Sequence, residues 1–398
     1  MPRGGVFPRP VLRFRRGTAV SPREGLVLFG PLKGPGRIRV ALAGEAGLLP
    51  RVERLWRNLV EGAKGYPPMV RLLGVEAEAY SIRGEELEKA LRDAASTGPD
   101  VVVVGIREDV PEDMDMYVRA KQVLAELGVP SQMVVRSTLE RLYGNRYVLF
   151  NLAVNIYAKA GGIAWGLADP MGWDAYLGLD VGGGVLSATL LVNPASPSIY
   201  WSTFPVLDVE YTGSVGDAVR WGLRAAGEAL GRRVRSIMVL RDGRAHWGEV
   251  EALRDSLAEA AAEGDLEEGY SYCMVEVRKR VIPVLVRRMG GYVTNPEKGA
   301  YLEMGADEYV VATTGWPERR AAYGTVRPIV VARVDTDNWE RRFAEAAREV
   351  YWLSSLHWGS MFTSPRTPIV TLYSHRISSF FRLGVYPDPE RMGGLWFL

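Results

Sequence analysis

The sequence predicts an α/β protein of two domains, in which a domain with a parallel sheet is followed by a domain with a mixed sheet. The chain has 398 residues, of which 47% are hydrophobic, and this is enough to bury two separate cores. Strand-like and helix-like segments alternate between residues 37 and 165. After residue 174, three strand-like segments follow one another with only short turns between them. The change of pattern predicts one domain at 37–165 and a second at 166–398.

The first domain is expected to be Rossmann-like. Its strand-like runs lie at 38–44, 77–82, 100–106 and 131–135, and its helix-like runs lie at 48–63, 84–96, 114–128 and 147–162. Strands that alternate with helices form a parallel sheet covered on both faces. The first strand ends in ALAGEAG, which lacks the full Gly-x-Gly-x-x-Gly pattern, so the alternation does not indicate a dinucleotide-dependent dehydrogenase.

Residues 1–36 are expected to form a short β linker before the first domain. Two short β pieces, VLRFRRG and GLVLFG, are separated by Pro and Gly and end in the turn-forming GPLKGPG. These pieces are too short to fold alone.

The second domain is expected to be RNase H-like. Its first three strands, at 175–184, 185–193 and 198–206, predict an antiparallel meander. A helix, a strand, a helix and a strand follow at 216–233, 235–243, 249–264 and 272–280. This β-β-β-α-β-α-β order, with Asp180 in the first strand and Asp242 at the end of the fourth, is the RNase H-like layout. Helices at 338–360 and 371–384 complete the domain.

Composition excludes several classes of protein. The formal net charge is +2, so binding to phosphates must come from a local arrangement rather than from a strongly basic chain. One cysteine excludes an internal disulfide, and three scattered histidines form no zinc motif. The basic N-terminus lacks an apolar run and no stretch is long enough to span a bilayer. We expect a soluble cytoplasmic protein with no membrane partner.

Polar residues at helical spacing suggest a site for a terminal phosphate. Tyr117 and Lys121 are four residues apart on one predicted helix, so both project from one face. Gln132 lies in the next strand, and Asn155 and Lys159 repeat the same spacing on the following helix. A phenol ring can stack under a base while its hydroxyl and the amines bind phosphate oxygens.

The segments YVRAK, SQMVV and NLAVNIYAKAGG, in this order, resemble the guide-binding motif of the MID domain of Argonaute proteins. RDGR, VRKR, SPRTPIVTLYSHRI and the terminal LWFL resemble the PIWI domain that follows MID, and residues 9–36 resemble the end of the linker that precedes it. The resemblance covers nearly the whole chain and leaves no room for N-terminal and PAZ domains. It implies a short, archaeal-type prokaryotic Argonaute with MID and PIWI only.

The resemblance implies roles for the phosphate-site residues. Tyr117, Lys121, Gln132 and Lys159 would hold the 5′ phosphate of a guide strand. Asn155 stands where many eukaryotic members have a further lysine. In the prokaryotic branch a divalent cation and the C-terminal carboxylate replace that charge, so Asn155 and the carboxylate of Leu398 would be metal ligands. Hard oxygen ligands suit Mg²⁺ or Mn²⁺.

The resemblance also implies an incomplete cutting site. RNase H-like nucleases need acidic residues that converge on two divalent cations. Asp180, Asp242 and His375 match three of the four family positions, and the two aspartates would be metal ligands. The glutamate of the family is missing from VLDVEYTGSVGDAV. Asp217 is nearest to its position and Glu210 lies earlier, so enzymatic activity stays open.

Two functions remain within the family. In one, the protein binds guide and target strands, DNA or RNA, and a separate effector protein acts in host defence. In the other, it is a guide-directed endonuclease that cuts the target. The missing glutamate favours the first. Dimerisation is left open.

Further contacts and one remoter alternative complete the expectations. Nucleic-acid backbone contacts are expected from Arg278, Lys279, Arg366 and Arg376.

LGLDVGGG also resembles the first phosphate loop of sugar kinases and actin-like ATPases, and this is the remoter alternative.

Overall fold

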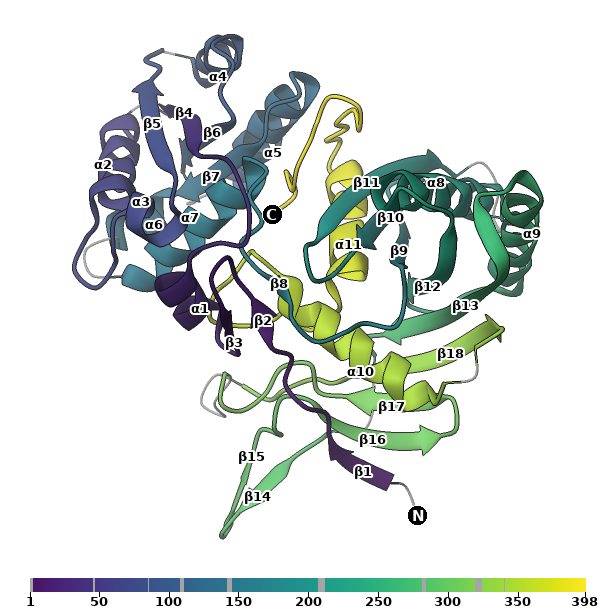
Figure 1. Cartoon of the computed structure of the whole chain (residues 1–398). Helices are drawn as coiled ribbons and strands as arrows, with labels where there is room; N and C mark the ends of the chain where they lie inside the picture. Colours follow the sequence, from purple (N-terminus) through teal and green to yellow (C-terminus); the bar gives the residue numbers. More distant parts are fainter. Residues whose placement is uncertain are drawn as a thin grey trace. The chain divides into compact units, whose positions relative to one another are not determined.

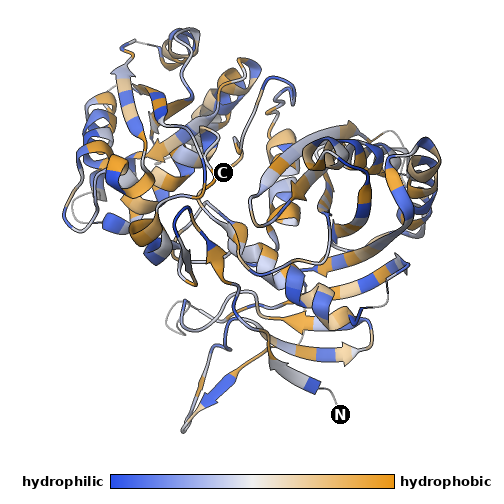
Figure 2. Cartoon of the chain, viewed as in Figure 1, coloured by the Kyte–Doolittle hydropathy of each residue, from blue (hydrophilic) through white to orange (hydrophobic). Residues whose placement is uncertain are grey.

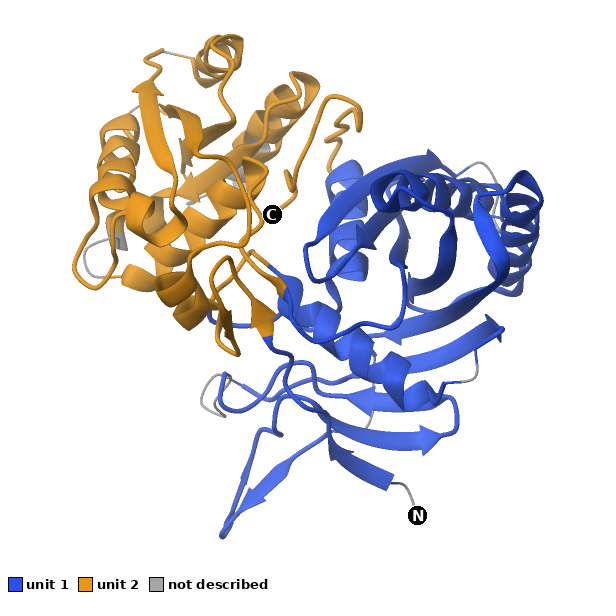
Figure 3. Cartoon of the chain, viewed as in Figure 1, with its two compact units in different colours: residues 1–11, 167–357, 362–382 blue, residues 12–166, 358–361, 383–398 orange. Residues whose placement is uncertain are grey.

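The computed structural model describes residues 3–45, 47–84, 86–107, 111–141, 145–206, 212–280, 284–318, 324–339 and 341–398, with only the backbone described for 111–115 and 141. The chain forms two compact units (Figure 3). Unit 1 comprises residues 1–11, 167–357 and 362–382, and unit 2 comprises residues 12–166, 358–361 and 383–398. Both units are thus assembled from segments that lie far apart in the sequence.

Unit 2 contains the predicted parallel sheet. Its strand order is β5-β4-β6-β7, and every neighbouring pair is parallel. The strands are β4 (Arg37–Gly44), β5 (Glu76–Ser81), β6 (Val101–Ile106) and β7 (Ser131–Val135). All six residues of β6 are buried, as a central strand covered on both faces requires.

Helices cover both faces of this sheet. Helices α4 (Leu87–Ser96) and α5 (Pro111–Glu126) pack against alternate residues of β4 and β6 in one apolar cluster. Helix α2 (Leu49–Glu61) packs on β4 and β6 and also contacts α3 (Met69–Leu73), α6 (Arg136–Arg141) and α7 (Arg146–Lys159). Helices α3 and α6 were not predicted, because each is too short to show a helical period.

The expected β piece at 25–30 is wrong, because this segment forms α1 (Pro22–Phe29). The Ser21 side chain accepts a hydrogen bond from the Glu24 backbone N–H, proline occupies the first turn, and Gly30 ends the helix with φ of 70°. The capping residues at both ends of this segment therefore favour a helix, although its apolar run alone suggested a strand. The other expected piece contains only β2 (Leu12–Arg13), which pairs with β3 (Thr18–Ala19) and β8 (Gly166–Leu167).

The described part of unit 1 contains a nine-stranded mixed sheet of order β1-β16-β17-β18-β13-β12-β9-β10-β11. Strands β9 (Ala175–Gly182), β10 (Val185–Val192) and β11 (Ser198–Pro205) form the predicted antiparallel meander. Strand β12 (Val234–Asp242) is parallel to both β9 and β13 (Leu266–Arg278), while β18 (Ile329–Asp337) is antiparallel to β13.

Helices cover the part of this sheet that is formed by β9, β10, β12 and β13. Helices α8 (Thr212–Leu230) and α9 (Trp247–Glu263) pack with the apolar residues of β9, β10, β12 and β13 in one core cluster. Figure 2 shows both hydrophobic and hydrophilic residues on these helices, as expected for helices with one buried face. Helix α11 (Ile369–Arg382) packs on β9, β10 and β12 (Figure 1).

Strand β18 and the remaining strands of unit 1 were not predicted. Strands β16 (Ala300–Gly305) and β17 (Glu308–Val311) extend the sheet beyond β18, and β1 (Arg3–Val6) forms its edge by pairing with β16. Strands β14 (Arg287–Met289) and β15 (Tyr292–Thr294) form a separate hairpin.

The helix predicted at 338–360 is shorter, because α10 (Phe343–Leu353) begins after Asn338, whose φ of 51° is incompatible with a helix, and ends in a 3₁₀ turn at Ser354–Leu356. No helix in the described parts of the chain is both long and apolar enough to cross a bilayer.

Candidate functional site

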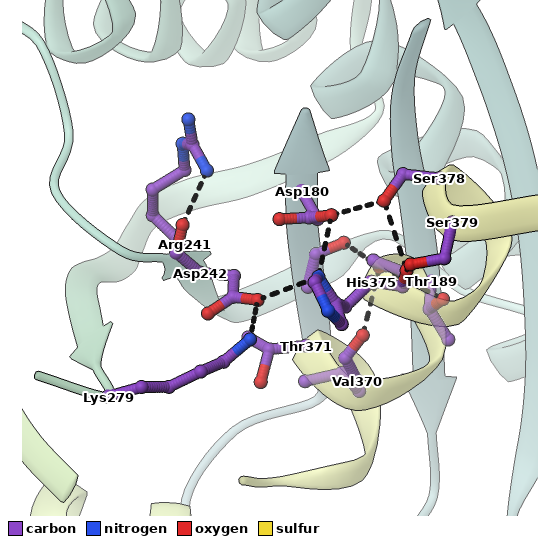
Figure 4. A network of polar contacts seen from close by, with 12 residues as sticks. Asp180, Thr189, Arg241, Asp242, Lys279, Val370, Thr371, His375, Ser378 and Ser379 are labelled. Carbon is purple, nitrogen blue, oxygen red and sulfur yellow. Dashed lines mark hydrogen bonds and ion pairs between the residues drawn. The ribbon is translucent and has the colours of Figure 1, made fainter. Parts of the chain in front are cut away.

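An acidic cluster lies at the carboxyl ends of two adjacent parallel strands in unit 1. Asp180 lies near the end of β9, and Asp242 is the last residue of β12. The register pairs Arg241 with Leu179, so the two aspartates are neighbours across the strands. His375 on α11 approaches both carboxylates (Figure 4).

The geometry of the cluster suits a cation. The His375 Nδ1 atom lies 3.3 Å from the Asp180 Oδ2 atom and 3.5 Å from the Asp242 Oδ2 atom. One ligand atom from each of the three residues lies within 4.8 Å of the others. The structure thus brings together three of the four residues that the sequence indicated as candidate catalytic residues.

Close contact between α11 and β9 positions the histidine. A side chain on Gly178 would place its Cβ atom 2.3 Å from the Val370 carbonyl carbon, so only glycine allows α11 to begin directly on β9. The Ser374 hydroxyl is 2.8 Å from the Gly178 carbonyl oxygen, to which it donates. The Ser378 hydroxyl donates to Asp180 (Figure 4). The two serines were not predicted, although Ser378 lies one helical turn after His375.

A lysine also occupies the cluster. The Lys279 Nζ atom lies 2.5 Å from the Asp242 Oδ2 atom, and one third of the lysine side chain is exposed while the aspartate is buried (Figure 4). The sequence predicted that Lys279 contacts a nucleic-acid backbone, whereas here it neutralises a candidate metal ligand.

A buried ion pair supports the end of β12. The Arg241 Nε atom lies 2.8 Å from the Glu249 Oε1 atom, and both side chains are buried. A second Arg241 nitrogen donates to the Asp242 carbonyl oxygen at 2.7 Å, and the His246 backbone N–H donates to Glu249 at 2.7 Å. This network links the backbone of Asp242 to the start of α9.

The two carboxylates have opposite pKa shifts. Burial raises the pKa of Asp242, and the Lys279 ammonium opposes only part of this effect. Burial alone would also raise the pKa of Asp180, but the hydrogen bonds from His375 and Ser378 outweigh it, so this pKa lies below its ordinary value. Asp180 is thus the better anion of the pair.

The structure does not bring Asp217 into the cluster. Helix α8 begins at Thr212, so Asp217 lies in the second turn rather than at the cap. Its side chain is largely exposed and lies 2.8 Å from the Arg220 guanidinium, with which it forms an ion pair. The same guanidinium also pairs with Glu259 on α9. Glu210 lies outside the described residues.

The predicted backbone-contact arginines have protein partners. Arg278 pairs with Glu276 at 2.8 Å and with Glu308 at 3.0 Å. Arg366 donates to the carbonyl oxygens of Lys279 and Pro328. Arg376 is half-buried on α11.

In unit 2, two lysines from different helices converge on the start of β7. The Lys121 amine, on α5, donates to the Ser131 carbonyl oxygen at 3.0 Å. The Lys159 amine, at the end of α7, donates to the Gln132 Oε1 atom at 2.7 Å. Both lysines are buried, at 4% and 3% exposure. Three of the predicted phosphate-site residues therefore meet around adjoining positions of one strand.

The other predicted phosphate-site residues lie on the same unit. Tyr117 is half-buried one turn before Lys121 on α5 and packs on the apolar cluster of that face. The Asn155 amide nitrogen donates to the carbonyl oxygens of Asn151, at 2.7 Å, and Gly359, at 3.2 Å. The Oδ1 atom of Asn155 is therefore the atom that could bind a metal ion.

The C-terminal segment packs beside the end of α7. A Cβ atom on Gly394 would lie 3.0 Å from the Lys159 carbonyl oxygen, so this segment runs directly against the helix end. Leu395, Trp396 and Phe397 are buried, and the half-buried Leu398 donates its N–H to the Leu395 carbonyl oxygen at 3.1 Å. Leu398 thus belongs to the unit that contains Lys159.

The glycines of LGLDVGGG have a structural explanation. Gly183 and Gly184 have φ of 68° and 77° and connect β9 to β10 as a two-residue hairpin turn. A Cβ atom on Gly183 would lie 2.6 Å from the Arg382 backbone nitrogen, so the turn also packs on the end of α11. The glycines that resembled the phosphate loop of an ATPase are therefore required by the turn and by its packing on α11, and they do not indicate a nucleotide site.

Comparison with known proteins identifies the fold. No protein-family model and no curated protein matches the sequence. Among solved structures, an Argonaute from Clostridium butyricum, bound to a guide DNA with a 5′ deoxycytidine and to a 19-mer target DNA, is similar with a TM-score of 0.73 and 21% sequence identity. The similarity covers 96% of this chain and 54% of that protein, so this chain spans about half its length.

The chain has an Argonaute-like fold. Its parallel sheet and its large mixed sheet correspond to the predicted Rossmann-like and RNase H-like parts, which confirms the predicted fold class. The predicted domain boundaries and the roles of the site residues stay predictions.

Proposed function

We propose that this protein binds the 5′-phosphorylated end of a guide nucleic-acid strand and, through base pairing, a complementary target. The observation that carries the proposal is the convergence of Lys121 and Lys159 on Ser131 and Gln132 in unit 2. Two ammonium groups supplied by separate helices form a local positive site in a chain whose net charge is only +2.

The surrounding residues add the other parts of a phosphate-end site. Tyr117 would stack under the first base, and Gln132 would bind a phosphate oxygen while it orients Lys159. The Asn155 Oδ1 atom and the Leu398 carboxylate are hard oxygen donors that fit Mg²⁺ or Mn²⁺. The Argonaute-like fold supports this proposal, because its structural neighbour is bound to guide and target DNA.

We further propose that the protein binds its target without cutting it efficiently. Asp180, Asp242 and His375 fit a divalent cation by donor type, and such an ion would supply Lewis-acid activation of water when bound. However, Lys279 already neutralises Asp242, and Asp217 is directed to Arg220 instead. A cytoplasmic effector that responds to target recognition in host defence would then supply the output.

Guide-directed cleavage remains the second candidate, and the acidic cluster is the observation that favours it. Incubation with a 5′-phosphorylated guide, a complementary strand and Mn²⁺ separates the two functions. We expect stable binding with no defined product. Defined cuts that disappear in Asp242→Ala would establish the endonuclease.

Guide binding itself is tested by comparing 5′-phosphorylated and 5′-hydroxyl oligonucleotides of one sequence, as DNA and as RNA. We expect a strong preference for the phosphate that Lys159→Met abolishes. The matched control is Lys89→Met, which removes an amine from α4 in the same unit. Equal affinity for both ends in the unaltered protein would refute the proposal.

A further inference from the structure

We infer that helix α1 of unit 2 docks an acidic, amphipathic helix of another protein. Leu26 lies on the buried face of α1, and the outward face carries Arg23, Glu24, Val27 and Leu28. The outward face of a surface helix is ordinarily polar. However, Val27 and Leu28 are 49% and 55% exposed, so this helix presents apolar side chains to solvent.

Two further exposed valines lie near α1. Val20 directly precedes the capping residue Ser21 and is 51% exposed. Val70 is 54% exposed on α3, which packs against α1. Single exposed apolar residues are common on a protein surface, whereas a group of them marks an interaction site. We call Val20, Val27, Leu28 and Val70 the α1 surface.

Uncompensated positive charge accompanies the α1 surface. Residues 12–36 contain five basic residues and one acidic residue, a formal charge of +4 where the whole chain has +2. Arg13, Arg15 and Arg23 are exposed and form no ion pair with any residue that the structure describes. The Arg23 guanidinium lies over the Phe150 ring, 5.7 Å from its centroid. A partner that covers the apolar residues must therefore bring negative charge.

Both ends of α1 are capped, so a partner is recognised through side chains rather than through the helix backbone. The Ser21 hydroxyl oxygen accepts a hydrogen bond from the Glu24 N–H in the first turn, at 3.4 Å. The Arg16 guanidinium donates to the carbonyl oxygens of Leu28 and Phe29 in the last turn, at 3.5 Å and 3.4 Å. An added strand needs open backbone groups, whereas a second helix packs on outward side chains.

The composition of the α1 surface favours a protein helix over other occupants. Its apolar residues are aliphatic, whereas single-stranded nucleic acids stack on aromatic rings. Glu24 and Leu28 are four residues apart on the outward face, so an anionic lipid surface would meet a negative charge beside the apolar residue. A second copy of this chain is a poor match, because its acidic helix α9 exposes no large aliphatic residue.

The test uses the full chain and three fluorescein-labelled helical peptides. Each peptide has leucine at alternating spacings of three and four residues, and its outer positions are glutamate, lysine or glutamine. Binding is measured by fluorescence anisotropy at low and high salt for Arg23→Glu, Arg23→Lys and Val27→Ser. The matched control is Lys89→Glu, which reverses an exposed cation on α4 of the same unit. Arg23, Val27 and Lys89 are exposed, so these replacements should leave the thermal unfolding of the protein unchanged.

We expect the glutamate peptide to bind and the lysine peptide not to bind. Arg23→Glu and Val27→Ser should each weaken binding of the glutamate peptide about tenfold, and Arg23→Lys should keep most of the affinity. High salt should weaken the glutamate peptide more than the glutamine peptide.

The inference does not depend on guide binding, and a partner of this chemistry would suit the effector proposed above. Arg23→Glu should leave the affinity for a 5′-phosphorylated oligonucleotide unchanged. Failure of the docking surface and failure of the proposed 5′-phosphate site therefore appear in separate measurements.

Equal affinities of Arg23→Glu and Lys89→Glu for the glutamate peptide would overturn the inference, and so would the absence of binding to the unaltered protein. Three other outcomes would also overturn it by assigning the α1 surface to another occupant. Weaker oligonucleotide binding in Arg23→Glu would indicate nucleic acid, and binding to phosphatidylglycerol vesicles that Val27→Ser weakens would indicate a membrane. A dimer that dissociates in Val27→Ser, measured by light scattering, would indicate a second copy.

Discussion

Replacing Lys279 with methionine should tighten the binding of Mn²⁺ to the acidic cluster. The lysine amine lies 2.5 Å from the Asp242 carboxylate oxygen, and a cation bound there would compete with it. Near a protein surface, unit charges about 4 Å apart attract by about 4 kcal/mol. One third of the lysine side chain is exposed, and screening by solvent reduces this to about 2 kcal/mol. Because about 1.4 kcal/mol corresponds to a tenfold change, Lys279→Met should bind Mn²⁺ about thirtyfold more tightly.

Isothermal titration calorimetry with MnCl₂ measures this change without any dependence on cleavage. Lys279→Arg is the matched control, because it keeps the positive charge and should bind Mn²⁺ as weakly as the unaltered protein. Adding Asp180→Asn to Lys279→Met should remove the gain, which separates this cluster from binding at Asn155 and Leu398. Equal affinities of Lys279→Met and Lys279→Arg for Mn²⁺ would contradict this prediction.

Two further predictions concern stability. Burial lowers the pKa of His357 to about 3, so the folded protein holds this side chain neutral while the unfolded chain takes up a proton below pH about 6.5. The free energy of unfolding is therefore unaffected by this histidine above pH about 6.5. Below that pH it falls by about 1.4 kcal/mol for each pH unit, until the pKa of His357 in the folded protein is reached. The free energy of unfolding, measured in urea at several pH values, should fall less steeply with decreasing pH for His357→Phe than for the unaltered protein. An unchanged dependence on pH would contradict this. Glu249→Ala leaves the Arg241 guanidinium buried without its carboxylate and should cost about 3 kcal/mol. Thermal unfolding should show a smaller loss for the double variant Arg241→Met, Glu249→Leu, and a single-variant loss below about 1 kcal/mol would contradict the buried-pair account.

Much of the fold could be predicted because its regular elements have clear sequence patterns. The alternating strands and helices between 37 and 165 and the meander after residue 174 appear where they were expected. Prediction failed where local patterns are weak. Strands β14 and β15 have three residues each, and β1 pairs with β16 from almost 300 positions away, so their pairing has no local signal.

The cluster was predictable in part for the same reason. Asp180 lies near the end of one strand and Asp242 ends the adjacent one, and the strand order alone brings them together. The partners of charged side chains depend instead on tertiary geometry. Nothing near Lys279 in the sequence indicates that its amine reaches Asp242, and nothing near Asp217 indicates that it faces Arg220 rather than the cluster. The approach of α11 required Gly178, whose spacing before Asp180 gave no signal by itself.

The central claim is recognition of a 5′-phosphorylated strand by the Lys121 and Lys159 site. The most direct measurement compares the affinity of the untagged protein for one oligonucleotide with and without a 5′ phosphate, in Mg²⁺ and in EDTA. We expect a strong preference for the phosphate that weakens in EDTA and disappears in Lys159→Met. Equal affinity for the two ends, or a preference that survives in Lys159→Met, would contradict it.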